Sequence, residues 1–168
     1  MFKKTGVKLE LLTDENMFLT YEEGMRGGIC NKVHSYAEAN NKYMKNYDKN
    51  KESSFLIYVD ATNLYGWAMS KKLPVDGFKW VDDLSMFTED FIKSYDEEGD
   101  VGYLLVVDIE YPKTLRMLHS DLPFLPDRMK VNKVKKLVCN VTDKENYSIH
   151  IAALKQALNH GLVLKKST

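Results

Sequence analysis

The sequence predicts an α+β fold in which helices pack on a mixed or antiparallel sheet. Two apolar runs, at residues 55–59 and 101–111, have the length and the β-branched and aromatic content of strands. Residues 152–160 carry leucines at the spacing of an amphipathic helix. The chain has 168 residues, of which 44% are hydrophobic, so it is long enough to bury a core.

The first half of the chain predicts one capped helix and one buried strand. Asp14 is expected to cap a helix that reaches Glu23. Residues 40–54 are rich in Asn, Asp, Lys and Ser and predict a surface loop. The elements expected after this loop are a strand over 55–59, a helical turn over 63–70 and a strand over 75–81.

The second half predicts most of the sheet. The strongest strand signal is residues 101–111, which Pro112 ends. Asp108 and Glu110 fall on one face of this strand, where they are either solvent-facing carboxylates or a pair of metal ligands. The other expected elements are a helix over 82–94, a loop over 122–134, a hairpin of 136–141 with 147–151, a helix over 152–160 with Gly161 as its C-cap, and a final strand over 162–164.

Charge is distributed unevenly although the formal net charge is zero. Residues 82–110 carry 1 basic and 10 acidic side chains, whereas residues 113–168 carry 11 basic and 4 acidic ones. A basic C-terminal third can follow a phosphate backbone, and a solvated lysine-rich surface is the other reading.

Several classes of protein are not indicated. The two cysteines and four histidines form no zinc-ligand spacing. No apolar run approaches the roughly 20 residues of a membrane span, so no membrane partner is expected. A reduced, intracellular protein is the simplest expectation.

Asp60 directly follows the apolar run 55–59. A carboxylate at the end of a buried strand is held by a rigid element, which suits a metal ligand. A structural role is the alternative for an Asp in this position. The surrounding string is Phe55-Leu56-Ile57-Tyr58-Val59-Asp60-Ala61-Thr62-Asn63-Leu64-Tyr65-Gly66-Trp67-Ala68-Met69.

This string resembles motif A of the family B DNA polymerases, in the organellar and viral branch that includes protein-primed enzymes and the polymerases of self-synthesising DNA transposons. Further blocks resemble the same branch and occur in the expected order: Thr5–Asp14, Gly24–Ile29, Ala39–Met44, Gly66–Pro74, Gly102–Pro112 and Lys155–Leu162. The resemblance implies DNA-directed DNA synthesis on a primer–template, assisted by two Mg²⁺ ions.

The resemblance also implies roles for the residues of motif A. Asp60 would be the catalytic carboxylate that bridges both metal ions, and Ala61 would offer its carbonyl oxygen. The backbone amides of Asn63 and Leu64 would hold the incoming deoxynucleoside triphosphate. Tyr65 would stack beneath the sugar and exclude a 2′-hydroxyl, with core packing as the alternative role of this aromatic ring.

Arg26, Gly27 and Gly28 resemble the aromatic-x-Gly-Gly motif that handles primer–template DNA in this branch, with Met25 in the aromatic position. A guanidinium binds phosphate, and adjacent glycines let the backbone approach a ligand closely. A plain turn is the alternative reading of these three residues.

Motifs B and C of this family lie downstream of the matched region, and no Asp-x-Asp occurs in the chain. We therefore expect a partial polymerase palm, incomplete without downstream strands, that is inactive alone and has the missing polymerase portion as a partner. It would comprise an entry segment (1–54), a palm portion with motif A (55–112) and a basic hairpin-helix-strand region (113–168).

Loss of the downstream strands would leave residues 55–59 as an exposed apolar edge. The full-length parent polymerase would act in the nucleus or at a viral or mobile-element replication site. The alternatives are a non-catalytic module that binds DNA or another polymerase piece through its basic third, and a product without function.

Overall fold

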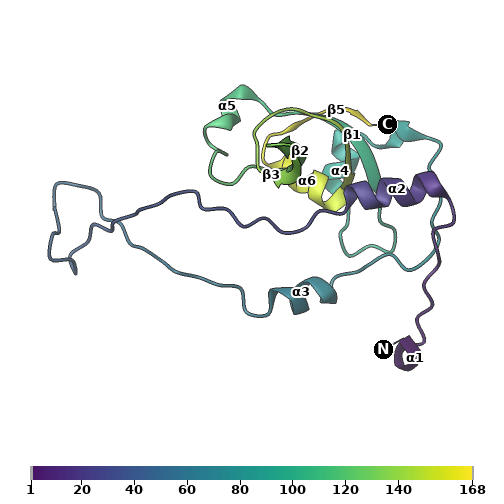
Figure 1. The fold of residues 1–168 in the computed structure, drawn as a ribbon, viewed down its shortest axis with the longest axis horizontal. Coiled ribbons are helices and arrows are strands. Elements are labelled where there is room, and N and C mark those ends of the chain that lie inside the picture. Colours follow the sequence, from purple (N-terminus) through teal and green to yellow (C-terminus); the bar gives the residue numbers. More distant parts are fainter. Residues whose placement is uncertain (1, 168) are drawn as a thin grey trace. The chain divides into compact units, whose positions relative to one another are not determined.

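The computed structural model describes residues 2–167, with the side chains of residues 4–166. The chain divides into two compact units, one formed by Met1–Ile29 with Leu73–Thr168 and the other by Cys30–Lys72. Figure 1 gives the order of the elements along the chain. The larger unit contains both sheets and most of the helices.

A three-stranded antiparallel sheet with the order β4-β1-β5 forms the centre of the larger unit. Strand β1 (Leu104–Glu110) pairs with β4 (Lys144–His150) on one side and with β5 (Val163–Ser167) on the other. Because both neighbours are antiparallel to β1, they run parallel to each other, and α6 (Ile151–Asn159) connects them as a split β-α-β unit. The predicted α+β class is confirmed.

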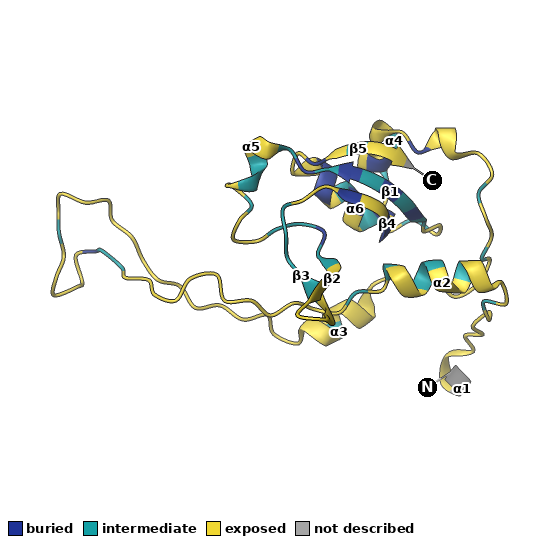
Figure 2. Ribbon diagram, turned by 45° about the horizontal axis from the view of Figure 1, so that its top comes forward, coloured by how far each residue is buried: buried dark blue, intermediate teal, exposed yellow. Residues whose placement is uncertain are grey.

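The core lies between this sheet and helices α6 and α4 (Glu89–Ser94). Residues of β1 alternate between buried and half-buried, as expected of a strand with one face on a core. Figure 2 shows the buried residues concentrated on β1, β4 and α6. The fully buried apolar side chains are Ile92, Val107, Ile109, Tyr111, Ile151, Leu154, Ala157 and Leu162.

Strands β2 (Asp127–Val131) and β3 (Val134–Val138) form a separate two-stranded hairpin. Asn132 and Lys133 make its two-residue loop with φ of 50° and 69°, the positive pair that a type I′ turn requires. The predicted loop over 122–134 is therefore right only up to residue 126, and the predicted hairpin of 136–141 with 147–151 is wrong. Residues 147–151 instead belong to β4 and the start of α6, and β4 pairs with β1.

The larger unit has further helices outside the core. They are α1 (Phe2–Thr5), α2 (Glu15–Gly24), the 3₁₀ turn η1 (Leu84–Met86) and α5 (Lys113–Arg116). Asp14 caps α2 as predicted, because its carboxylate accepts a hydrogen bond from the Met17 amide at 2.9 Å.

Two further predictions for the larger unit are corrected. The helix over 82–94 is divided into η1 and α4, which has its own N-cap at Thr88. Residues 75–81 form no strand, and Phe78 and Trp80 instead contact α2 and its cap: the Phe78 ring lies 5.6 Å from that of Tyr21, and the Trp80 indole donates to Asp14 at 3.3 Å. The alternation of apolar and polar residues over 75–81, which predicted a strand, reflects these contacts with α2.

The smaller unit contains helix α3 (Leu64–Ser70) and an isolated bridge between Asn40 and Ser54. The predicted strand over 55–59 is absent: these five side chains are 62–96% exposed. An apolar run folds as a strand only beside a partner strand, and the described residues supply none. The segment is exposed as irregular chain and not as the expected apolar edge of a sheet. No helix among the described residues is long and apolar enough to cross a membrane.

Candidate nucleic-acid interface

Asp60 lies in the exposed segment between residues 55–59 and α3. Within the described residues its carboxylate makes no hydrogen bond and no ion pair, so both oxygens face solvent. The structure places Ala61 beside it, also exposed.

Asn63 caps the helix that follows Asp60. It adopts the left-handed conformation with φ of 55°, and its side-chain oxygen accepts a hydrogen bond from the Gly66 amide at 3.2 Å. A Cβ at Gly66 would clash with the side-chain amide of Asn63, so this cap needs glycine at that position. Leu64 and Tyr65 form the first turn of α3, and Tyr65 is 84% exposed rather than part of a core.

The described residues do not assemble a metal centre. No three His, Cys, Asp or Glu side chains in residues 4–166 gather closely enough to hold a metal ion. Asp60 and the Ala61 carbonyl therefore offer one carboxylate and one carbonyl oxygen, which fall short of a two-metal site.

Arg26 is bound to strand β4. Its guanidinium donates to the Ser148 carbonyl at 2.6 Å and to the Gly24 carbonyl at 3.3 Å, and it lies 3.8 Å from the centre of the Tyr147 ring. Its Nε is buried and has no hydrogen-bond partner. This side chain thus anchors the segment after α2 to the sheet. The sequence predicted Arg26 as a phosphate ligand and did not predict this structural role.

Gly27 and Gly28 are exposed, and a Cβ added at either would meet nothing within 4 Å. Gly24 is different, because a Cβ there would lie 3.0 Å from the Ser148 hydroxyl and 3.1 Å from Leu104. The close approach in this segment is therefore made at Gly24, where the end of α2 meets β4, while Gly27 and Gly28 present open backbone.

The root of the β2–β3 hairpin meets the same segment. Arg128 donates a hydrogen bond to the Met25 carbonyl at 2.6 Å. The predicted DNA-binding residues Arg26, Gly27 and Gly28 thus lie beside the base of the hairpin, within the larger unit. The sequence alone did not bring these two segments together.

The hairpin itself is basic and exposed. From Arg128 to Lys136 every residue is exposed, and the stretch contains Arg128 and four lysines, Lys130, Lys133, Lys135 and Lys136. Lys130 and Lys135 are directly opposite each other in the ladder. Within the described residues none of these four ammonium groups pairs with a carboxylate. Like charges at opposed positions destabilise a hairpin, so the pair is unfavourable in the free protein.

Two buried polar groups of β4 support the hairpin root. Lys144 is only 2% exposed and hydrogen bonds to the Asn140 side chain. Burial lowers the pKa of its ammonium, and nearby Asp127 opposes that effect. Burial also raises the pKa of Tyr147 to about 12, and its hydroxyl donates to the Pro126 carbonyl at 2.8 Å, just before β2.

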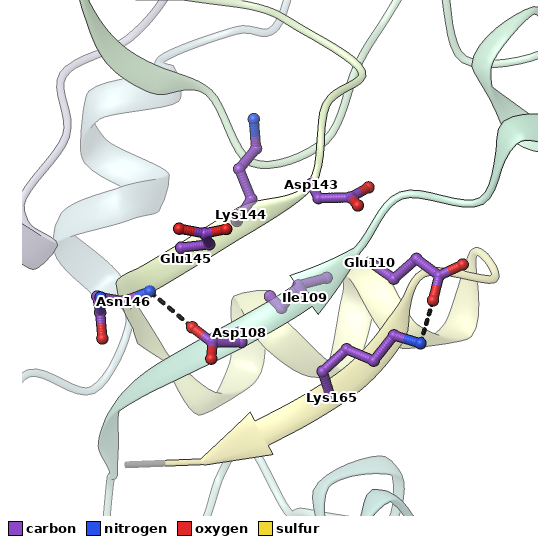
Figure 3. Close-up of a pocket in the computed structure, with 8 residues that line it drawn as sticks. All are labelled: Asp108, Ile109, Glu110, Asp143, Lys144, Glu145, Asn146 and Lys165. Carbon is purple, nitrogen blue, oxygen red and sulfur yellow. Dashed lines mark hydrogen bonds and ion pairs between the residues drawn. The ribbon is translucent and has the colours of Figure 1, made fainter.

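An acidic groove of about 290 Å³ is lined by residues of β1, of the start of β4 and of β5. Its carboxylates are those of Asp108, Glu110, Asp143 and Glu145, and Figure 3 shows Lys144 pointing away from Asp108. Lys165 forms an ion pair with Glu110, which raises the pKa of that lysine, and the Asn146 amide donates to Asp108 at 2.8 Å. Asp108 and Glu110 share a face as predicted, and both are used in contacts within the sheet.

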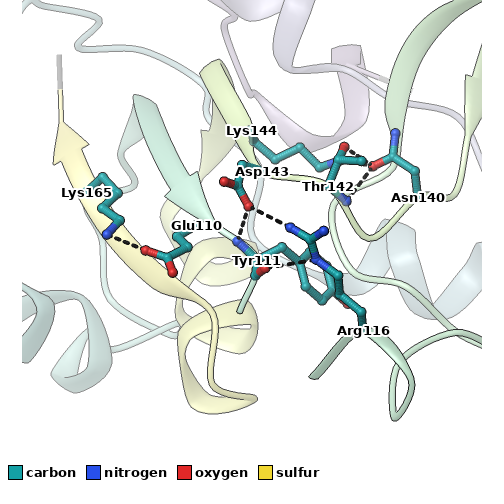
Figure 4. A network of polar contacts seen from close by, with 8 residues as sticks. All are labelled: Glu110, Tyr111, Arg116, Asn140, Thr142, Asp143, Lys144 and Lys165. Atoms are coloured by element: carbon teal, nitrogen blue, oxygen red, sulfur yellow. Dashed lines mark hydrogen bonds and ion pairs between the residues drawn. The ribbon is translucent and has the colours of Figure 1, made fainter. Parts of the chain in front are cut away.

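Asp143 connects the end of β1 to the start of β4 (Figure 4). It accepts from the Tyr111 amide at 2.9 Å and from Arg116 at 3.5 Å. Asn140 accepts from Thr142 on the neighbouring loop and from Lys144 at the start of β4. These bonds fix the strand ends and make a structural network.

Comparisons of the chain with protein-family models, with curated proteins and with solved structures found no match.

Proposed function

We propose that this chain is part of a family B DNA polymerase of the viral, organellar or transposon type, and that the parent enzyme performs DNA-directed DNA synthesis. The supporting observation is the placement of Asp60, unpartnered and exposed, three residues before a capped turn into α3. That is the order of carboxylate, turn and helix that motif A requires. The α+β unit around β1 would then belong to the polymerase palm.

Mg²⁺ would be held by Asp60 and the Ala61 carbonyl only together with carboxylates from outside the described residues. The partners in this proposal are the remaining polymerase portion, the primer–template and the deoxynucleoside triphosphate. Because the described residues do not complete the metal site, no catalytic step is assigned to them.

The first test is binding of Mg²⁺–deoxynucleoside triphosphate followed by NMR on the labelled chain. We expect weak, metal-dependent shifts at the amides of Asp60, Asn63, Leu64 and Tyr65, lost in Asp60→Asn. Tyr65→Ala should reduce the preference for deoxynucleotides over ribonucleotides. Absence of any shift at these residues at millimolar nucleotide would contradict the proposal.

Primer extension with Asp60→Ala as the control, and the sequence encoded downstream, complete the test. We expect no extension by this chain alone, and a downstream Lys…Asn-Ser-x-Tyr-Gly block followed by Asp-Thr-Asp. A stop codon under an intact promoter would favour the second candidate.

The second candidate is a DNA-binding module without synthesis. It is favoured by the 11 basic against 4 acidic side chains of residues 113–168. Salt-sensitive DNA binding together with no nucleotide shift at residues 60–65 would support this candidate over the first.

A further inference from the structure

We infer that the β2–β3 hairpin is a duplex-binding finger that contacts the phosphate backbone of DNA without reading its sequence. The inference rests on the DNA-binding part of the proposed function and is independent of DNA synthesis. It narrows the phosphate contact expected of the basic third, residues 113–168, to a surface formed by Lys130, Lys133, Lys135 and Lys136.

The first argument is the unfavourable charge arrangement of the free hairpin. Lys130 and Lys135 are a cross-strand pair, so their Cβ atoms are about 4.5–5.5 Å apart. No carboxylate of the described residues neutralises them. An anion between the two ammonium groups removes this repulsion, which makes the pair a receptor for a phosphate group.

The second argument is the distribution of charge around the hairpin. Lys130 and Lys135 lie on one face of the ribbon, Lys136 lies on the other beside Met129, and Lys133 is in the turn. Positive charge on both faces and at the tip fits a ligand that surrounds the hairpin with anions. The groove of a duplex does so, because phosphates line both of its walls.

The third argument is geometric. The major groove is about 12 Å wide and admits a two-stranded ribbon. The hairpin contains no Phe, Tyr or Trp on which unpaired bases would stack, which favours a duplex over a single strand.

The root of the hairpin is fixed while its outer part is free. Arg128 is bonded to Met25, and Tyr147 to Pro126, whereas the residues from Met129 to Lys136 are exposed. Arg128 is hydrogen bonded to Met25 at the root, so the cationic side chains of the outer hairpin are all lysines. Lysines contact phosphate as point charges and give no base readout, so binding should be independent of sequence.

The test compares Lys130→Gln/Lys135→Gln with Lys45→Gln/Lys49→Gln, a control that removes the same charge from exposed positions in the smaller unit. Binding to a labelled duplex of about 16 base pairs is measured by anisotropy at several salt concentrations. For the hairpin variant we expect the slope of log K against log salt to fall by about two, and affinity at low salt to fall at least tenfold. The control should resemble the wild type.

Each other outcome overturns the inference in a distinguishable way. Equal binding by wild type and hairpin variant places the DNA contact elsewhere and leaves the proposed function standing. Absence of duplex binding by the wild type removes both the inference and the DNA-binding part of the proposed function. Salt-sensitive dimerisation, binding only to vesicles of anionic lipid, or a more than tenfold preference for one duplex sequence also contradicts the finger described here.

Discussion

Arg26 illustrates how one side chain can hold a functional segment in place. Its guanidinium stacks on Tyr147 and bonds to the Ser148 carbonyl, so the strand beneath it fixes the path of Gly27 and Gly28. The same contact brings that segment to the hairpin root through Met25 and Arg128. A cation that appears in sequence as a phosphate ligand is here part of the packing between α2 and β4.

Replacing Arg26 should therefore lower stability. We expect Arg26→Ala to reduce the free energy of unfolding by about 2–3 kcal/mol, through loss of a charge-assisted hydrogen bond and of the stacking on Tyr147. Gly27→Ala should change it by less than about 0.5 kcal/mol, since its Cβ meets open space. Urea denaturation followed by circular dichroism measures both. Wild-type stability in Arg26→Ala would refute the anchoring role.

Helix α6 begins with a titratable cap. His150 Nδ1 accepts a hydrogen bond from the Ala152 amide at 3.2 Å, which only an unprotonated nitrogen can do. The His150 ring faces that of Tyr95, with 6.5 Å between ring centres. Much of His150 is exposed, but its partial burial lowers the pKa of the imidazole. The start of the helix that covers the sheet thus depends on a neutral imidazole.

Stability should therefore fall as His150 becomes protonated. Because the folded pKa lies below the unfolded value near 6.5, the unfolded state binds more protons, and the contribution of His150 is complete above that value and is lost as the pH falls below it. His150→Asn, which caps without titrating in this range, should flatten the decline of melting temperature between pH 7 and 5 relative to wild type. An identical pH profile in the variant would contradict this cap.

How much of each element the sequence predicts depends on whether its signal is local. Helix α6, β1 and the Asp14 cap were predicted because their spacing and capping residues lie within the element itself. The prediction of a strand over 55–59 was wrong because the apolar content of a segment does not show whether a partner strand lies beside it. The hairpin was missed because Pro123 and Pro126 suggested a loop, although Asn132 is a residue that tolerates the positive φ of a type I′ turn.

The candidate interface was predicted in part. The position of Asp60 before a helix follows from local sequence, and so does the excess of basic residues after 113. The contact of Arg26 with Tyr147 joins residues 121 positions apart, and the opposition of Lys130 and Lys135 follows from the turn, so neither is visible in a linear pattern. The buried Lys144 likewise depends on tertiary packing.

On the scale of the whole molecule, the burial of hydrophobic side chains is confined to one region. Every buried hydrophobic residue that the structure describes lies between Phe87 and Leu162, and residues 55–59 have no backbone hydrogen bond within the described chain. Stability is therefore expected to be unequal along the chain, with the sheet and α6 as the cooperative unit.

Hydrogen exchange measured by mass spectrometry checks this inequality. We expect amides of β1, β4 and α6 to be protected most strongly and those of residues 55–59 to exchange at nearly the intrinsic rate. Under the proposed function, addition of a polymerase partner should protect residues 55–59. Strong protection of this segment in the isolated chain would indicate an association that the described structure lacks.

The segregation of charge has a practical consequence for handling the protein. With 24 basic and 24 acidic side chains, the chain has no formal net charge at pH 7. A purification planned from the net charge alone would therefore not use ion exchange. An ion-exchange resin, however, binds the charged part of the protein surface that faces it. The lysines of the hairpin should retain the chain on a sulfonate column, and the carboxylates of residues 82–110 should retain it on a quaternary-amine column, at the same neutral pH.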